Sequence, residues 1–275
     1  MLKALEHLLF PKKRDKRLRA RVKREMRAEM EATLAPLRSQ LRKCGQRIDV
    51  VADLLGEMMY PERAEVRTDQ ESAWGGKHGF RYVVHHLSED WKATRVPLWK
   101  NLLTFVPDVQ SVAEFGCNIG ANLKALREIR PDLDLAGVEI NRFAVEVLKR
   151  ERVSEVNLGS VGTYDFGRKF DLVFTRGVLI HIAPDDLPNV LANMERHAKK
   201  YVLIWENYDE AMHNMPWYDK RVGDGKAGVN YQFWRDFAGE FHKQFPNWTV
   251  LASGVGLEEK STRKHGDLVW TIFRR

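Results

Sequence analysis

The chain of 275 residues has little cysteine and no long apolar run, and both absences limit what it can be. Its two cysteines, Cys44 and Cys117, lie far apart, so we expect neither a disulfide framework nor a thiolate metal cluster, and no metal site. No apolar run reaches the roughly 18 residues of a membrane-spanning helix. The first residues also lack a small-residue cleavage site. We therefore expect a cytoplasmic protein.

Positive charge is concentrated at the start of the chain. Residues 1–60 hold 15 Lys and Arg against 8 Asp and Glu, which accounts for the whole net charge of +7. A short apolar cluster within 2–10 precedes ten bases within 12–27, an arrangement that suits a peripheral contact with an anionic membrane surface. A solvated basic helix without a partner is the alternative. No aromatic residue lies between 11 and 59, so this segment offers no side chain on which a base could stack. Nucleic acid is therefore disfavoured as a partner.

Residues 34–58 show heptad spacing. Apolar side chains recur at alternating steps of three and four from Leu34 to Met58, which is typical of a left-handed coiled coil. Pro36 and two glycines weaken the helix. We expect self-association of the chain through this segment, and a single helix packed on the rest of the protein is the alternative.

A glycine turn follows an apolar run in residues 113–120, Ala-Glu-Phe-Gly-Cys-Asn-Ile-Gly, and a helical pattern begins directly after it. Gly116 and Gly120 allow a ligand to approach backbone N–H groups at a helix N-terminus. Nineteen residues after Gly120, Glu139 ends a second apolar run. An acid at this spacing can accept hydrogen bonds from the hydroxyls of a ribose. The pattern predicts a cofactor that contains a nucleoside.

The acid ahead of the turn, Glu114, would repel a pyrophosphate and suits a cationic or zwitterionic ligand. The segment resembles motif I of the class I S-adenosylmethionine-dependent methyltransferases. That resemblance implies S-adenosyl-L-methionine as cofactor, with Glu114 near its methionine end. The usual middle glycine is Asn118 here, and asparagine tolerates positive φ better than most residues.

Strands alternate with helices over the last 170 residues, which predicts an α/β, doubly wound parallel sheet. The resemblance implies a seven-stranded, mostly parallel, Rossmann-like methyltransferase sheet whose last strand is antiparallel. We expect a helical and coiled-coil extension at 1–60, a linker and aromatic cap at 61–106, and the methyltransferase domain at 107–275. The expected strands lie at 109–113, 137–140, 156–158, 170–175, 201–205, 249–251 and 268–273, and the expected helices at 120–130, 141–151, 185–198 and 234–244.

Aromatic residues at 74–82 suggest a lid over a cofactor or a sugar, whereas for Trp91 and Trp99, at helical spacing, we prefer ordinary core packing. A narrower resemblance, to the methylases associated with pseudaminic acid biosynthesis, covers roughly 70–275. It rests on 114–120, 137–141, 170–188, 74–82 and 235–240, and it implies a carbohydrate acceptor. The region 209–232 departs from that pattern, and we expect it to cover the acceptor pocket.

Two side chains are candidate general bases. His181 lies just beyond the fourth expected strand and Glu206 ends the fifth, both at the edge where ligands bind in open α/β folds. A structural histidine is the alternative for His181. The residues that we assign to cofactor binding are Glu114, Gly116, Asn118, Gly120, Glu139, Ser160, Arg176 and Gly177, and those that we assign to the substrate are Arg235 and Tyr208. Arg176 and Arg235 are also candidates for binding a carboxylate or a phosphate.

The sequence therefore predicts an S-adenosylmethionine-dependent methyltransferase whose acceptor is a sugar acid, a nucleotide sugar or a surface-polysaccharide unit. Two alternatives remain open. One is a methyltransferase for another small molecule or for RNA. The other is a non-catalytic scaffold with the methyltransferase fold.

Overall fold

The computed structural model describes residues 64–208, 214–216, 231–256 and 268–275. The expected extension at 1–60, with its basic stretch and its heptads, lies outside these residues, as does most of the expected acceptor cover at 209–232. Self-association and membrane contact through the extension remain predictions. Among the described helices, none is long and apolar enough to cross a bilayer.

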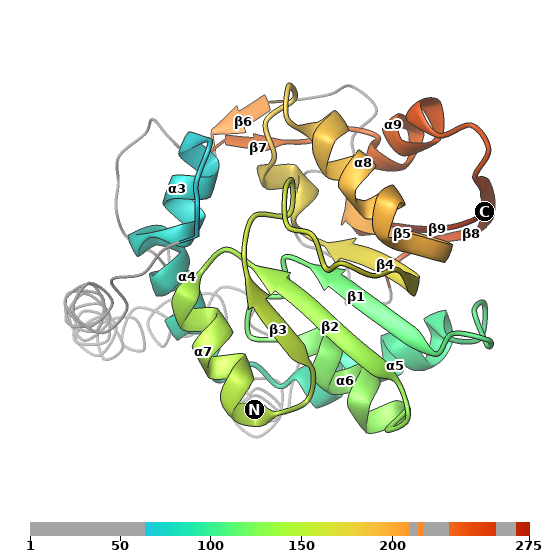
Figure 1. The fold of residues 1–275 in the computed structure, drawn as a ribbon, viewed down its shortest axis with the longest axis horizontal. Helices are drawn as coiled ribbons and strands as arrows, with labels where there is room; N and C mark the ends of the chain where they lie inside the picture. The colour runs from blue at the N-terminus through green and yellow to red at the C-terminus, as the bar shows by residue number, and fades with distance from the viewer. Residues whose placement is uncertain (1–63, 209–213, 217–230, 257–267) are drawn as a thin grey trace, which may run out of the picture. The chain divides into compact units, whose positions relative to one another are not determined.

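A seven-stranded sheet forms the centre of the described fold, in the order β3-β2-β1-β4-β5-β9-β8 (Figure 1). The first five strands pair in parallel, and β9 is antiparallel to both of its neighbours. This topology confirms the mostly parallel, Rossmann-like methyltransferase sheet. The strands are β1 Ser111–Phe115, β2 Asp134–Glu139, β3 Glu155–Leu158, β4 Phe170–Arg176, β5 Ala198–Asn207, β8 Thr249–Val255 and β9 Leu268–Arg274.

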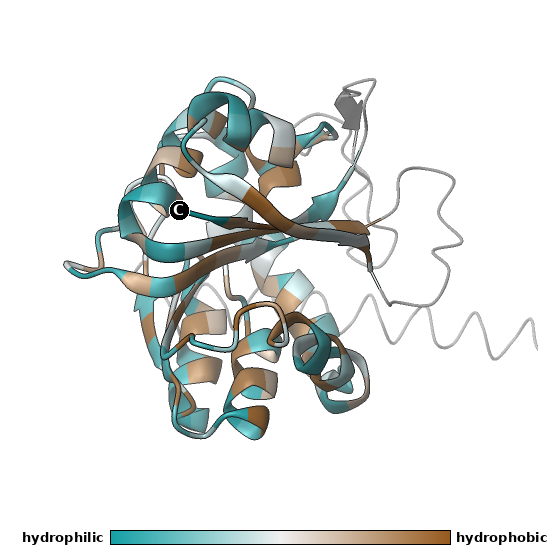
Figure 2. Cartoon of the chain, turned by 90° about the vertical axis from the view of Figure 1, so that its right-hand side faces the viewer, coloured by the Kyte–Doolittle hydropathy of each residue, from teal (hydrophilic) through white to brown (hydrophobic). Residues whose placement is uncertain are grey.

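The central strands are apolar on both sides because helices cover both faces of the sheet. All five residues of β1 are buried, as are six of the seven in β4. Such continuous apolar runs are typical of parallel strands buried between helical layers. Figure 2 shows the sheet with hydrophobic strands between the two layers of helices.

The first helical layer consists of α5 (Trp91–Leu102), α6 (Ala121–Ile129) and α7 (Arg142–Glu151). Trp99 of α5 is fully buried in this layer's core, and its indole Nε1 donates to Asn122 Oδ1 at 3.2 Å. The expected core packing of Trp99 is confirmed, and Trp91 packs partly buried against the same core. Residues 91–102 thus support the sheet, and α3 (Asp69–Gly75) and α4 (Lys77–His86) are the segments left to act as a cap.

The opposite layer consists of the 3-10 helix η1 (Leu179–His181), α8 (Leu187–His197) and α9 (Phe237–Gln244). Helix α9 begins three residues later than the sequence pattern predicts, because Asp236 caps it by accepting a hydrogen bond from Gly239 N at 2.8 Å. A separate antiparallel pair, β6 (Asn214–Pro216) with β7 (Tyr231–Phe233), was not anticipated from the sequence.

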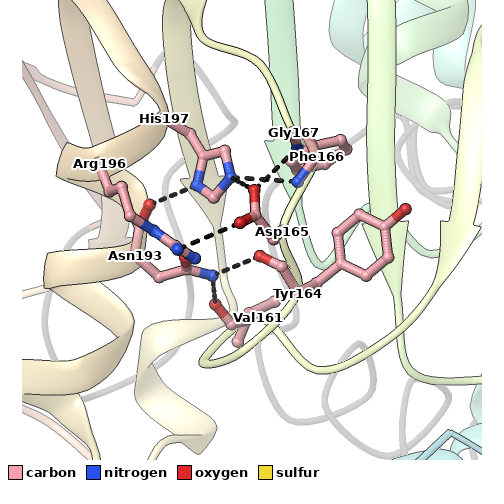
Figure 3. Close-up of polar contacts among 8 residues, drawn as sticks. All are labelled: Val161, Tyr164, Asp165, Phe166, Gly167, Asn193, Arg196 and His197. Carbon is pink, nitrogen blue, oxygen red and sulfur yellow. Dashed lines mark hydrogen bonds and ion pairs between the residues drawn. The ribbon is translucent and has the colours of Figure 1, made fainter.

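Polar side chains of α8 hold the loop that follows β3 (Figure 3). The buried Asn193 donates to the carbonyls of Val161 and Tyr164, both at 2.9 Å. His197 Nδ1 lies 2.8 Å from the Asn193 carbonyl, and its Nε2 lies 3.1 Å from both Phe166 N and Asp165 Oδ1. These bonds replace the secondary-structure partners that the loop backbone lacks.

We expect Asn193→Ala to destabilise the protein by roughly 1–3 kcal/mol, because it leaves two loop carbonyls without their donor in a buried site. Urea unfolding measures the change. The exposed Asn189 on the same helix provides the control, since Asn189→Ala should shift the midpoint little. Equal effects of the two substitutions would mean that the contacts with Asn193 do not hold the loop.

Candidate functional site

The carboxyl ends of β1, β2 and β4 meet beside α3 and α4 and enclose a hollow of about 140 Å³, which we call the strand-end hollow. Ligands in open α/β folds bind at this edge of the sheet. Its sheet side includes Gly116, Asn118, Glu139, Arg176, Gly177 and His181, and its helix side includes Glu71, Trp74, Gly79 and Tyr82. Six residues that the sequence analysis assigned to the cofactor or to catalysis therefore come together here.

The glycine turn shapes one wall of the hollow. Gly116 and Asn118 adopt left-handed φ angles of 79° and 48°, as the substitution of asparagine for the middle glycine allows. Gly116 N and Cys117 N both donate to the Val138 carbonyl, at 2.8 and 3.1 Å. Asn118 Oδ1 is buried and has no hydrogen-bond partner among the described residues. The turn thus offers an unused acceptor to the hollow.

Glu139 lies at the end of β2, where the sequence places it, and is 8% exposed. Its Oε2 accepts from Asn118 N and its Oε1 from Asn141 N, each at 2.8 Å. Burial raises the pKa of the Glu139 carboxyl, and these backbone donors oppose the rise. A carboxylate has about four lone-pair sites, so Glu139 keeps the capacity to accept from a ligand.

The cap is joined to the sheet through Asn141 and Glu71, two residues that the sequence analysis did not assign. Asn141 Nδ2 donates to the Trp74 carbonyl at 3.0 Å while its Oδ1 caps α7, and Ser160 Oγ donates to Glu71 Oε1. The signal for such a role of Asn141 was its place at the start of a helical pattern, where asparagine is a favoured N-cap. A Cβ on Gly79 would lie 1.8 Å from the Trp74 carbonyl oxygen, so this approach requires glycine.

His181 lines the hollow, and its ring lies 4.5 Å from the Trp74 ring between centroids. Burial, with a smaller contribution from His78, lowers the pKa of His181 to about 3. The imidazole is therefore neutral at physiological pH and is a weak proton acceptor.

Three residues assigned to the cofactor do not line the strand-end hollow. Glu114 accepts from Asn122 Nδ2 at 2.6 Å, and burial raises its pKa to about 8, so this carboxyl is mostly protonated at neutral pH. Gly120, with φ of 72°, is the N-cap of α6. Ser160 lines a neighbouring hollow. The contact of these three with a cofactor stays a prediction.

A second hollow of about 170 Å³, the β5-end hollow, contains Glu206, Tyr208 and Arg235. Glu206 is buried, and its Oε1 accepts from Val178 N at 3.0 Å. Val178 lines the strand-end hollow, so this bond connects a residue of the β5-end hollow to the backbone that borders the strand-end hollow. Burial raises the pKa of Glu206 to about 7, and the bond from Val178 N opposes the rise.

The shifted pKa of Glu206 should appear in the pH dependence of stability. The value is about 7 in the fold against an ordinary 4.5, so folding favours the protonated carboxyl. Its contribution is fully present below pH 4.5 and is lost as pH rises through 7. Relative to Glu206→Gln, which stays neutral, the wild type should lose roughly 3 kcal/mol over this interval.

Urea unfolding of both proteins at a series of pH values measures this difference, in which all other titrating groups cancel. A stability difference that does not change between pH 4 and pH 8 would show that the Glu206 carboxyl titrates normally.

Residues 113–201 match the family described as "Methyltransferase domain". A curated relative from Saccharopolyspora spinosa, a dTDP-4-amino-2,3,4,6-tetradeoxy-D-glucose N,N-dimethyltransferase, is 29% identical over 137 residues. That match covers 47% of this chain and 53% of the relative, so the chain spans about half the length of the curated relative.

Two solved structures share the fold. The sugar N-methyltransferase KedS8 from Streptoalloteichus sp. has a TM-score of 0.52 and 16% identity, over 71% of this chain and 92% of its own. The magnesium protoporphyrin IX methyltransferase from Synechocystis, with S-adenosylhomocysteine bound, has a TM-score of 0.55 and 13% identity, over 76% of this chain and 100% of its own.

Among the described residues, no group of three His, Cys, Asp or Glu side chains could hold a metal.

Proposed function

We propose that this protein, whose residues 113–201 match the methyltransferase-domain family, transfers a methyl group from S-adenosyl-L-methionine to a carbohydrate. The observation that carries the proposal is the buried Glu139 carboxylate at the end of β2, facing a hollow beside the glycine turn. A carboxylate in this place can bind both hydroxyls of a ribose.

The residues of the strand-end hollow fit this cofactor. Glu139 accepts from the ribose hydroxyls, and the unpartnered Asn118 Oδ1 offers an acceptor to an ammonium or amino group. Gly116 presents no side chain to the hollow, so the backbone can approach the cofactor closely. The cofactor supplies a methyl group on a positively charged sulfur. The sulfur is the leaving group, and because it leaves as a neutral thioether, its departure needs no general acid.

Methyl transfer to a hydroxyl or an amine benefits from a base that takes the proton of the acceptor. The ideal base has a pKa near the working pH, which favours Glu206, at about 7, over His181, at about 3. With the cofactor bound, it would supply the methyl group and Glu206 would take the proton of the acceptor hydroxyl or amine. His181, packed on Trp74, then shapes the hollow and orients the cofactor.

The carbohydrate part of the proposal is supported by the relatives. The Saccharopolyspora relative and KedS8 are, by their names, sugar N-methyltransferases. Our narrower expectation of a sugar acid, drawn from the resemblance to the methylases of pseudaminic acid biosynthesis, belongs to the same proposal.

We expect Glu139→Ala to weaken binding of S-adenosylhomocysteine by more than tenfold, because a lost charge-assisted hydrogen bond is worth about 1.5–3 kcal/mol. Isothermal titration calorimetry measures the affinity. Since alanine also leaves Asn118 N and Asn141 N without their acceptor, Glu139→Gln should be measured beside it, as it retains the bulk. Glu128→Ala, at an exposed position, is the control. Unchanged affinity in a folded Glu139 variant would overturn the cofactor assignment.

If Glu206 takes the proton, Glu206→Gln should lower kcat by about 10²- to 10⁴-fold. Binding of S-adenosylhomocysteine should persist, and the rise of kcat through pH 7 should disappear. In His181→Ala, by contrast, we expect weaker cofactor binding with a preserved pH profile. The reverse pattern, a large loss of kcat in His181→Ala with affinity intact, would make His181 the base.

A further inference from the structure

We propose that the β5-end hollow binds an acidic group of the acceptor and that Arg235 is the residue that holds it. The acceptor is then an anionic sugar, its acid being a carboxylate or a phosphate. This inference rests on the proposed function and names the class of its substrate.

The observation that carries the proposal is a buried cation that forms no ion pair with a described residue, since Glu240, the one carboxylate that acts on it, does so from a longer distance. Arg235 is 9% exposed, and its Nε is buried with no hydrogen-bond partner. No ion pair to its guanidinium occurs within the part of the chain that the structure describes. Burying an unpaired charge is unfavourable, so such an arrangement leaves the guanidinium available to an anionic ligand.

The other buried cations show that this fold pairs such groups when they are structural. Arg95 is 8% exposed and bonds Glu89 Oε1 at 2.6 Å. Lys124 is 6% exposed and bonds Glu151 Oε1 at 2.6 Å. Arg235 differs from both because it forms no such pair. The neighbouring Asp236 is occupied as the N-cap of α9, and Glu240 acts on Arg235 only from a longer distance.

The surroundings of Arg235 suit a polar ligand that reaches toward the methyl donor. Glu206 lines the same hollow, and its Oε2 is buried with no hydrogen-bond partner among the described residues. Ser253 and Thr271 add hydroxyl groups to the lining. An acceptor whose acid lies on Arg235 can therefore present a hydroxyl or an amine to Glu206, which contacts the Val178 backbone that borders the strand-end hollow.

Thermal unfolding of the full-length protein tests the inference with three probes at constant ionic strength: inorganic phosphate, glucuronate and, as a neutral comparison, glucose. We expect the wild type to gain a few °C in Tm with phosphate or glucuronate and nothing with glucose. The anion that stabilises more identifies the acid. Stabilisation by neither anion, or equal stabilisation by glucose, would overturn the proposal.

Arg235→Met retains most of the side-chain length and removes the charge. Without added anion, it should unfold at the same or a higher temperature than the wild type, because no ion pair is lost, and it should not respond to phosphate or glucuronate. Arg130→Met, at a surface ion pair, is the control and should keep the wild-type response. A lower Tm of Arg235→Met together with an unchanged anion response would make Arg235 a structural residue.

Binding of S-adenosylhomocysteine separates this inference from the proposed function. Arg235→Met should keep the wild-type affinity, because Arg235 does not line the strand-end hollow. A wild type that responds to anions and binds no S-adenosylhomocysteine would refute the methyltransferase proposal. A wild type that binds S-adenosylhomocysteine and ignores both anions would refute the anionic acceptor alone.

Discussion

The Glu139 carboxylate joins the parts of the site that come from distant stretches of sequence. One oxygen accepts from Asn118 N in the glycine turn, and the other accepts from Asn141 N at the start of α7. Asn141 in turn donates to the Trp74 carbonyl of the cap, 67 positions away. One buried acid therefore fixes the turn, a helix start and the cap relative to one another, and the strand-end hollow lies between them. Its burial keeps these bonds from competition with water.

The two hollows divide the chemistry between them. The strand-end hollow is built from backbone turns, the buried acid Glu139 and the rings of the cap, so its features suit the cofactor positioning that we propose. The β5-end hollow contains a carboxyl with pKa of about 7 and a buried guanidinium, to which we assign proton transfer and recognition in the proposals above. Val178, which lines the strand-end hollow, donates its N–H to Glu206 of the β5-end hollow, so a shift of that loop would affect both.

Local sequence patterns predicted the strands and helices well where an apolar run or a helical periodicity continued without a break. The buried runs of β1 and β4 are apolar throughout, and α6 and α7 begin and end within one residue of the expected bounds. Helix α9 was placed too early, because the cap by Asp236 depends on a bond that periodicity does not report. The β6–β7 pair was missed because two strands of three residues each carry almost no periodic signal.

The sequence by itself determined that a glycine turn and an acid at the end of the next strand would meet, because parallel neighbouring strands end at the same edge. It also determined that Asn118 could replace a glycine. The tertiary structure alone decided the pKa values of the titratable groups and which charged groups have a bonding partner. Glu114 bonds Asn122 and burial raises its pKa to about 8, burial lowers the pKa of His181 to about 3, and Arg235 Nε is left without a hydrogen-bond partner. These outcomes depend on burial and on partners distant in sequence, and neither quantity is a property of the local pattern.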